Sequence, residues 1–262
     1  MRLARLVLFA GLFVASLACG GGSGGIGMVG CSAGGPAADM VTGPAVDPAT
    51  AAVITASVKF EGAVPAPTMV RIDGDPKCVA ENGTSQRPSE TIVVGDRQSL
   101  QNVFVYVKDG LGKYAFPIPA EPVVLDQQKC RYTPRVLGVR VGQRLSIHNS
   151  DPLLHNVRAE GKINRPFNMS TPLQGVSFDR TFATREVMVP VRCDVHNWMS
   201  AWIGAIDHPF FGVTGADGRV VMNGLPPGTY TIEAWHEELG TKTEQITVGP
   251  KESKDVSFTF SR

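Results

Sequence analysis

The stretch VRCDVHNWMSAW, residues 191–202, places a thiol, an imidazole and a thioether three residues apart, at Cys193, His196 and Met199. Upstream, LSIHNSDPLLHNV at 145–157 predicts a strand, a polar Asn-Ser-Asp-Pro turn and a second strand that begins at His155. If this turn and the 191–202 loop lie at the same end of a β-sandwich, one thiolate, two imidazoles and one thioether can converge on a single point.

This donor set favours copper. Two His and one Cys in a trigonal arrangement, with a weak axial Met, hold copper in blue electron-transfer sites, and thiolate and thioether select copper by their softness. Zinc would more often recruit a second Cys or a carboxylate in place of the Met. A binuclear copper centre would need a second Cys in the loop, and Val195 and Asn197 show that there is none. We therefore expect one copper ion.

Residues 124–208 resemble a cupredoxin, a plastocyanin- or amicyanin-like domain. YTPRVLGVRVGQRLSIHNSDPLLHNV is similar to the first half of the family, and CDVHNWMSAWIGAID is similar to its ligand loop and last strand. The resemblance implies a Greek-key β-sandwich in which His155, Cys193 and His196 are the strong copper ligands and Met199 is the axial one.

The same resemblance implies roles for the neighbours of the ligands. Asn156 would hydrogen-bond across to the ligand loop and hold the two segments together. His196 would be the more exposed ligand and the port for electrons, surrounded by Leu153, Leu154, Trp198 and Trp202. The chain departs from the family at Val191, where an aromatic residue is usual, and at Trp198, which is bulky for this loop.

The remaining apolar runs are short, β-branched or aromatic, and mostly alternating, as in VITASVKF, NVFVYVK and YTIEAW, and none carries a convincing helical period. The fold class is therefore all-β. VTGADGRVVMNGLPPGTYTIEAW resembles a carboxypeptidase regulatory-like module, a transthyretin-like β-sandwich. Residues 209–262 supply too few strands for such a core, so we expect 51–123 to complete a split sandwich into which 124–208 is inserted. The alternative assigns 53–107 to the edge of the cupredoxin.

The N-terminus, MRLARLVLFAGLFVASLAC, has two arginines, a short apolar run and small residues before Cys19. This pattern predicts a signal peptide over 1–19. It also resembles a bacterial lipobox, which would make Cys19 the lipidated first residue; ordinary cleavage by signal peptidase is the alternative. Residues 20–50 are rich in Gly, Ala, Ser and Pro and predict a flexible tether. We expect an exported lipoprotein, periplasmic or anchored to the outer membrane by its lipid.

In an exported protein, cysteines are usually paired or occupied. Cys78 and Cys130 both lie in Lys-Cys turns that follow an Asp, and we predict that they form a disulfide. Their alternative role, as two further metal ligands, lacks a neighbouring His or second Cys. Cys193 is then left without a protein partner, so burial or a metal should protect it.

The formal net charge is +1 without a basic cluster, which gives no indication of nucleic-acid binding. WHEELG at 235–240 lacks the second His of a zinc protease, so Glu237 and Glu238 are interpreted as ordinary hairpin carboxylates, and we expect no enzyme. The leading hypothesis is an electron carrier that serves a redox partner protein. The alternatives are a copper-delivery protein and a surface adhesion or scaffold module with a vestigial metal site.

Overall fold

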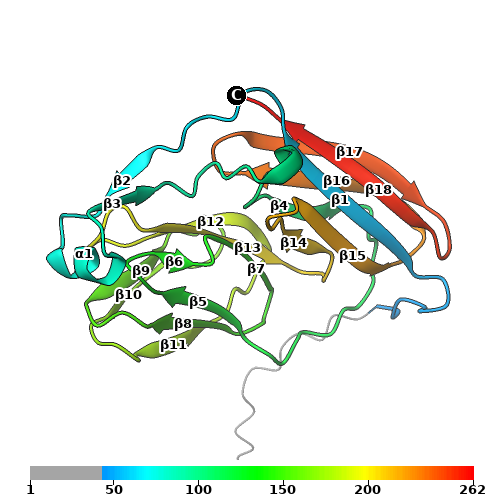
Figure 1. Ribbon diagram of the computed structural model, residues 1–262. Coiled ribbons are helices and arrows are strands. Elements are labelled where there is room, and N and C mark those ends of the chain that lie inside the picture. The colour runs from blue at the N-terminus through cyan, green and yellow to red at the C-terminus, as the bar shows by residue number, and fades with distance from the viewer. Residues whose placement is uncertain (1–42) are drawn as a thin grey trace, which may run out of the picture. The chain divides into compact units, whose positions relative to one another are not determined.

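A computed structural model describes residues 43–262 (Figure 1). The predicted signal peptide, Cys19 and the tether up to residue 42 lie outside the described residues. The described part consists of strands with one short α-helix and one 3-10 turn, so the predicted all-β class is confirmed. No helix within residues 43–262 has the length and apolarity needed to cross a membrane.

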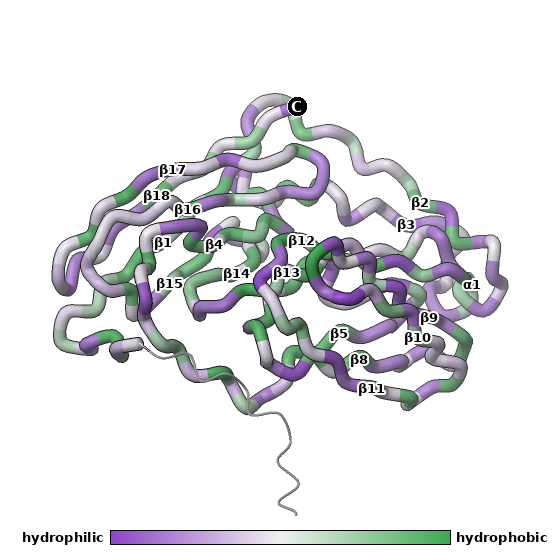
Figure 2. The backbone as a smooth tube through the Cα atoms, turned by 180° about the vertical axis from the view of Figure 1, so that it is seen from behind, coloured by the Kyte–Doolittle hydropathy of each residue, from purple (hydrophilic) through white to green (hydrophobic). Residues whose placement is uncertain are grey.

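One sandwich combines strands from both ends of the described chain. Its three-stranded sheet has the order β15 (Arg219–Leu225), β1 (Ala52–Phe60) and β18 (Ser253–Phe260). Its four-stranded sheet has the order β14 (Phe211–Val213), β4 (Phe104–Asp109), β16 (Gly228–His236) and β17 (Gly240–Val248). Alternate residues of β1 are buried, and they pack against β4 and β16 in one apolar core. Figure 2 shows hydrophobic and hydrophilic positions interleaved along these strands.

The other sandwich carries the candidate ligands. Its five-stranded sheet has the order β10 (Phe167–Thr171), β9 (His155–Ala159), β12 (Glu186–Arg192), β13 (Ser200–Ile206) and β7 (Val136–Arg140). Its four-stranded sheet has the order β11 (Ser177–Arg180), β8 (Leu145–Asn149), β5 (Val123–Gln127) and β6 (Tyr132–Thr133). The two sheets enclose a separate apolar core, to which Leu125, Ile147, Val157 and Ile203 belong.

A third part is an excursion between β1 and β4. It is a two-stranded ribbon of β2 (Met69–Arg71) and β3 (Gln86–Pro88), with α1 (Pro76–Asn82) at its tip, followed by the 3-10 turn η1 (Asp96–Gln98). Asp75 caps the start of α1 by accepting a hydrogen bond from Lys77 N, and Gly83 ends the helix in the left-handed conformation at φ 67°. The ribbon leaves the first sandwich and carries α1 to the ligand-bearing one (Figure 1).

Residues 51–123 are thus divided between the two sandwiches. β1 pairs with β15 and β18, and β4 pairs with β14 and β16, whereas the α1 segment contacts the ligand-bearing sandwich. The end of the predicted tether also belongs to the folded part, because Pro44 O accepts from Ala115 N and Thr50 O accepts from Lys251 N.

The junction between the sandwiches is polar as well as apolar. Arg135 and Glu237 form a two-pronged ion pair with N–O distances of 2.6 and 2.8 Å, and Glu237 also accepts from Trp202 Nε1. Trp202 packs against Trp235 at a ring distance of 5.1 Å. Glu237 is therefore not the ordinary hairpin carboxylate that the sequence suggested, because its position at the junction buries it against a cation.

Candidate metal centre

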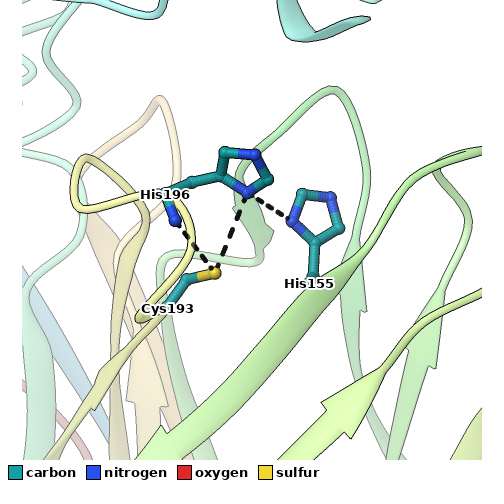
Figure 3. Close-up of side chains that lie close together, drawn as sticks. All are labelled: His155, Cys193 and His196. Carbon is teal, nitrogen blue, oxygen red and sulfur yellow. Dashed lines mark hydrogen bonds between the residues drawn. The ribbon is translucent and has the colours of Figure 1, made fainter. Parts of the chain in front are cut away.

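Two chain segments bring three of the predicted ligands together. His155 opens β9, directly after the turn that leaves β8, and Cys193 and His196 lie in the loop between β12 and β13. The loop closes on itself, because Cys193 N donates to Met199 O and Met199 N donates to His196 O. These backbone bonds turn Cys193 and His196 toward the same side, where His155 approaches from β9 (Figure 3).

The ligand atoms are close enough to share one ion. Nδ1 of His155 and Nδ1 of His196 are 2.9 Å apart, and Sγ of Cys193 is 3.9 Å from Nδ1 of His196. One ligand atom from each of the three residues lies within 4.8 Å of the other two. Metal–nitrogen and metal–sulfur bonds of about 2.0 and 2.3 Å span the 2.9 and 3.9 Å separations. All three residues are buried, so the three potential ligand atoms face one another out of contact with solvent.

Met199 and Asn156 complete the predicted set. Met199 is fully buried in the same apolar cluster as Cys193, on the same loop. Asn156 Oδ1 accepts from Asp194 N at 2.7 Å and lies 3.4 Å from Cys193 Sγ. Asn156 therefore bridges β9 and the ligand loop, which is the contact that the family resemblance implied.

Each histidine also bonds to a carboxylate through its outer nitrogen, a feature that the sequence reasoning missed. Asp151 Oδ2 lies 2.8 Å from Nε2 of His155, and Asp75 Oδ2 lies 3.1 Å from Nε2 of His196. A carboxylate that accepts from Nε2–H leaves the Nδ1 lone pair free for a metal, fixes the ring and makes the imidazole a stronger donor. Asp151 lies two residues after Asn149 in the polar turn, so the sequence placed this carboxylate close to His155. Asp75 comes from a segment far away in the sequence, and no comparable signal pointed to it.

The electrostatics of the candidate site favour the thiolate form of Cys193. Burial raises the pKa of the Cys193 thiol, but hydrogen bonds with His155 and His196 and the backbone contacts of Asn156 and His196 outweigh burial and lower the pKa to about 6. Burial lowers the pKa of His155, and the bonds to Asp151 and Cys193 more than reverse that effect. Thiolate is the form that binds metal, so the site holds its sulfur ligand close to the required state.

The expected exposure of His196 is wrong. Its side chain is only 2% exposed, because Asp75 covers its outer nitrogen and the ring of Trp198 packs at 5.1 Å from the imidazole ring. Leu153 is buried and Leu154 is exposed, while Trp202 lies at the junction with Trp235 and not beside the ligands. The α1 segment covers the side of His196 that was expected to be exposed to solvent or to a redox partner.

The structure joins Cys78 and Cys130 in a disulfide with a Cα–Cα distance of 5.7 Å. Their sulfurs do not act as further ligands in this state, although each lies near a ligand histidine. Ligand atoms of Asp75, Cys78 and His196 form one group within 4.8 Å, and those of Cys130, Asp151 and His155 form another. The disulfide therefore lies next to the candidate metal ligands.

His148 and His208, the histidines nearest to the candidate ligands in the sequence, do not belong to this group. His148 Nε2 contacts Ser146 Oγ on β8. His208 is buried at the opposite sandwich, where Nε2 bonds to Val107 O and Nδ1 accepts from Phe210 N. Both therefore serve local structure.

The chemistry of the donor set fits copper. One thiolate and two imidazoles in a buried group, with a thioether on the same loop, suit a soft metal that also accepts nitrogen donors. Carboxylates lie outside the inward-facing donors and bond to the outer nitrogens of the rings. The carboxylate oxygens of Asp151 and Asp75 thus orient the imidazole rings and are not themselves among the inward-facing donors.

No protein-family model and no curated protein matches the chain. Among solved structures, part of it is similar to an amicyanin variant in the Cu(I) form, with 19% identity, a TM-score of 0.29, and coverage of 34% of this chain and 85% of that one. A purple cupredoxin from Nitrosopumilus maritimus gives 21% identity, a TM-score of 0.27, and coverage of 32% and 98%. A copper-containing nitrite reductase from Thermus scotoductus gives 21% identity, a TM-score of 0.30, and coverage of 38% of this chain; the chain spans only 25% of that enzyme's length.

Proposed function

We propose that this chain is an electron-transfer protein with one copper ion bound by His155, Cys193 and His196, and with Met199 as a weak axial ligand. The observation that carries the proposal is the convergence of one thiolate and two inward-facing imidazole nitrogens within 4.8 Å, in a buried group. Copper bound there would cycle between two oxidation states.

Electron transfer is favoured over copper delivery by how firmly the ligands are held. Carboxylates fix both imidazoles, Asn156 ties β9 to the ligand loop, and the ligand side chains are buried. A site that keeps its geometry in both oxidation states has little to reorganise when an electron arrives. A delivery site would instead need a ligand that is easily reached by the receiving protein, and His196 is covered.

The cellular setting is part of the proposal. The signal-like N-terminus and the Cys78–Cys130 disulfide support an exported protein, held at the cell envelope by a lipid on Cys19 and serving a redox partner protein. We propose no enzymatic reaction.

The decisive test is a titration of the purified metal-free protein with Cu(II). We expect one equivalent to produce an intense visible band from thiolate-to-copper charge transfer, and Cys193→Ser to abolish it. Absence of the band in the wild type would refute the copper assignment. Reversible voltammetry, with slow transfer of Cu(I) to a chelator, would support the carrier; irreversible cycling with rapid transfer would favour delivery.

A further inference from the structure

The segment of residues 72–85, here called the cap, covers the outer side of the metal centre. It contains α1 and its flanks, and it belongs to the excursion that leaves the first sandwich between β1 and β4. Its contact with the centre is made by Asp75, which caps α1 and bonds to Nε2 of His196 with the same carboxylate. The cap therefore covers the outer nitrogen of His196, while Trp198 packs against its ring.

The cap is attached to one tight turn in the ligand-bearing sandwich. Cys78 on α1 is disulfide-bonded to Cys130 in the turn between β5 and β6, and Asn82 Nδ2 donates to Lys129 O in the same turn. Within 72–85, only Ile72 and Cys78 are buried. A segment that buries so little apolar surface opens locally at low free-energy cost unless it is crosslinked, so the disulfide dominates its attachment.

The same turn supports the other histidine. Lys129 and Cys130 have positive φ angles of 54° and 52°, which non-glycine residues adopt at a cost. Asp151 accepts hydrogen bonds from the backbone N–H groups of both, at 2.6 and 2.7 Å, and also bonds to Nε2 of His155. The disulfide thus links the Asp75–His196 pair to the Asp151–His155 pair through one turn.

We propose that Asp75 is a positioning residue of the metal centre and that the Cys78–Cys130 disulfide is a lock whose reduction opens the cap and frees His196. This inference rests on the proposed function for the identity of the metal and adds a control of its exchange. The opening reagent is a dithiol: its two S–H groups are oxidised to a disulfide, and the two electrons and two protons convert the Cys78–Cys130 bond into two thiols. His155 stays in place, because Asp151 and its turn belong to the sandwich itself.

The lock is tested first on the metal-free full-length protein, so that the result does not depend on copper. Diethyl pyrocarbonate acylates accessible imidazoles, and mass spectrometry locates the modified residue. We expect His196 to be protected in the oxidised wild type and to react about tenfold faster or more after dithiol treatment or in the Cys78→Ser/Cys130→Ser variant. His208, which is buried elsewhere, stays protected throughout.

Single substitutions on the cap separate the lock from a general loss of structure. Asp75→Asn keeps the disulfide and weakens the bond to His196, so we expect an intermediate labelling rate. Glu81→Gln changes an exposed carboxylate on the same helix and should leave the rate unchanged. Equal labelling of His196 before and after reduction, or equal rates for Asp75→Asn and Glu81→Gln, would overturn the proposal.

A second experiment measures metal exchange in the copper-loaded protein. Ascorbate reduces the copper while leaving the disulfide intact, and bicinchoninate then receives Cu(I). We expect transfer to be about 10- to 100-fold faster in the double serine variant than in the wild type, because the outer partner of His196 is lost. Unchanged transfer would refute control of exchange. A wild type without the thiolate band that still shows gated labelling would refute the copper function and leave the lock standing.

Discussion

The ion pair between Arg135 and Glu237 should account for a large part of the coupling between the two sandwiches. Their side chains are only 13% and 10% exposed, and Glu237 accepts from both Arg135 and Trp202. Glu237→Ala would leave a guanidinium without its counterion and an indole N–H without its acceptor. Removing one partner of a buried pair costs about 3 to 5 kcal/mol, and the residual exposure argues for about 3 kcal/mol here.

The neighbouring residue provides a matched control. Glu238 pairs with Arg262, and these side chains are 42% and 57% exposed. Solvent screens such a pair, so Glu238→Ala should cost less than about 1 kcal/mol. The two substitutions remove the same group from adjacent positions and differ in burial and partners.

Urea unfolding monitored by circular dichroism and tryptophan fluorescence measures both costs. Two of the three tryptophans, Trp202 and Trp235, lie at the junction, so the fluorescence reports mainly on it. In a cycle with Arg135→Ala, we expect a coupling energy of about 1 to 3 kcal/mol. A Glu237→Ala protein no less stable than Glu238→Ala, or a coupling near zero, would refute the view that this pair holds the junction.

Three further predictions concern the ligands and pH. Met199→Leu should keep the visible copper band and raise the reduction potential, measured by voltammetry, because a weak donor to the oxidised metal is lost. Asn156→Ala should weaken copper binding about 10- to 100-fold in a chelator competition, because β9 is released from the ligand loop. Burial lowers the pKa of His208 to about 4. The unfolded chain binds that proton from about pH 6.5, so the free energy of unfolding should fall as the pH drops from about 6.5 to 4, and less steeply in His208→Gln.

The candidate ligand set could be proposed from the sequence because its signals are local. Cys193, His196 and Met199 lie within one loop, and His155 follows a polar turn whose residues favour a reversal. Strand alternation likewise indicates an all-β chain, since one face of each strand must be buried. These inferences rest on residues close together in the sequence, and such residues largely determine where turns and strands form.

The covering of His196 could not be predicted in this way. Asp75 is 121 residues away in the sequence and comes from an excursion of the other sandwich. α1 has a visible start at Asp75–Pro76 and a visible end at Gly83, but seven residues are too few for a helical period to stand out. Glu237 shows the same limit, because the sequence indicates a hairpin but not what the hairpin packs against.

The pairing of β1 with β18 has a consequence for biosynthesis. β1, the first strand of the described chain, pairs in parallel with β18, the last, in a register that begins with Val53 opposite Ser253. The sheet of β1 is therefore complete only after β18 has been synthesised. The ligand-bearing sandwich, from β5 to β13, needs no strand from beyond Ile206. During synthesis from the N-terminus, we therefore expect it to assemble while the C-terminal strands are still missing, with the non-local β1–β18 pairing as the slow last step. A nascent chain stopped shortly after Ile206 would already contain every side chain of the candidate metal centre and its cap.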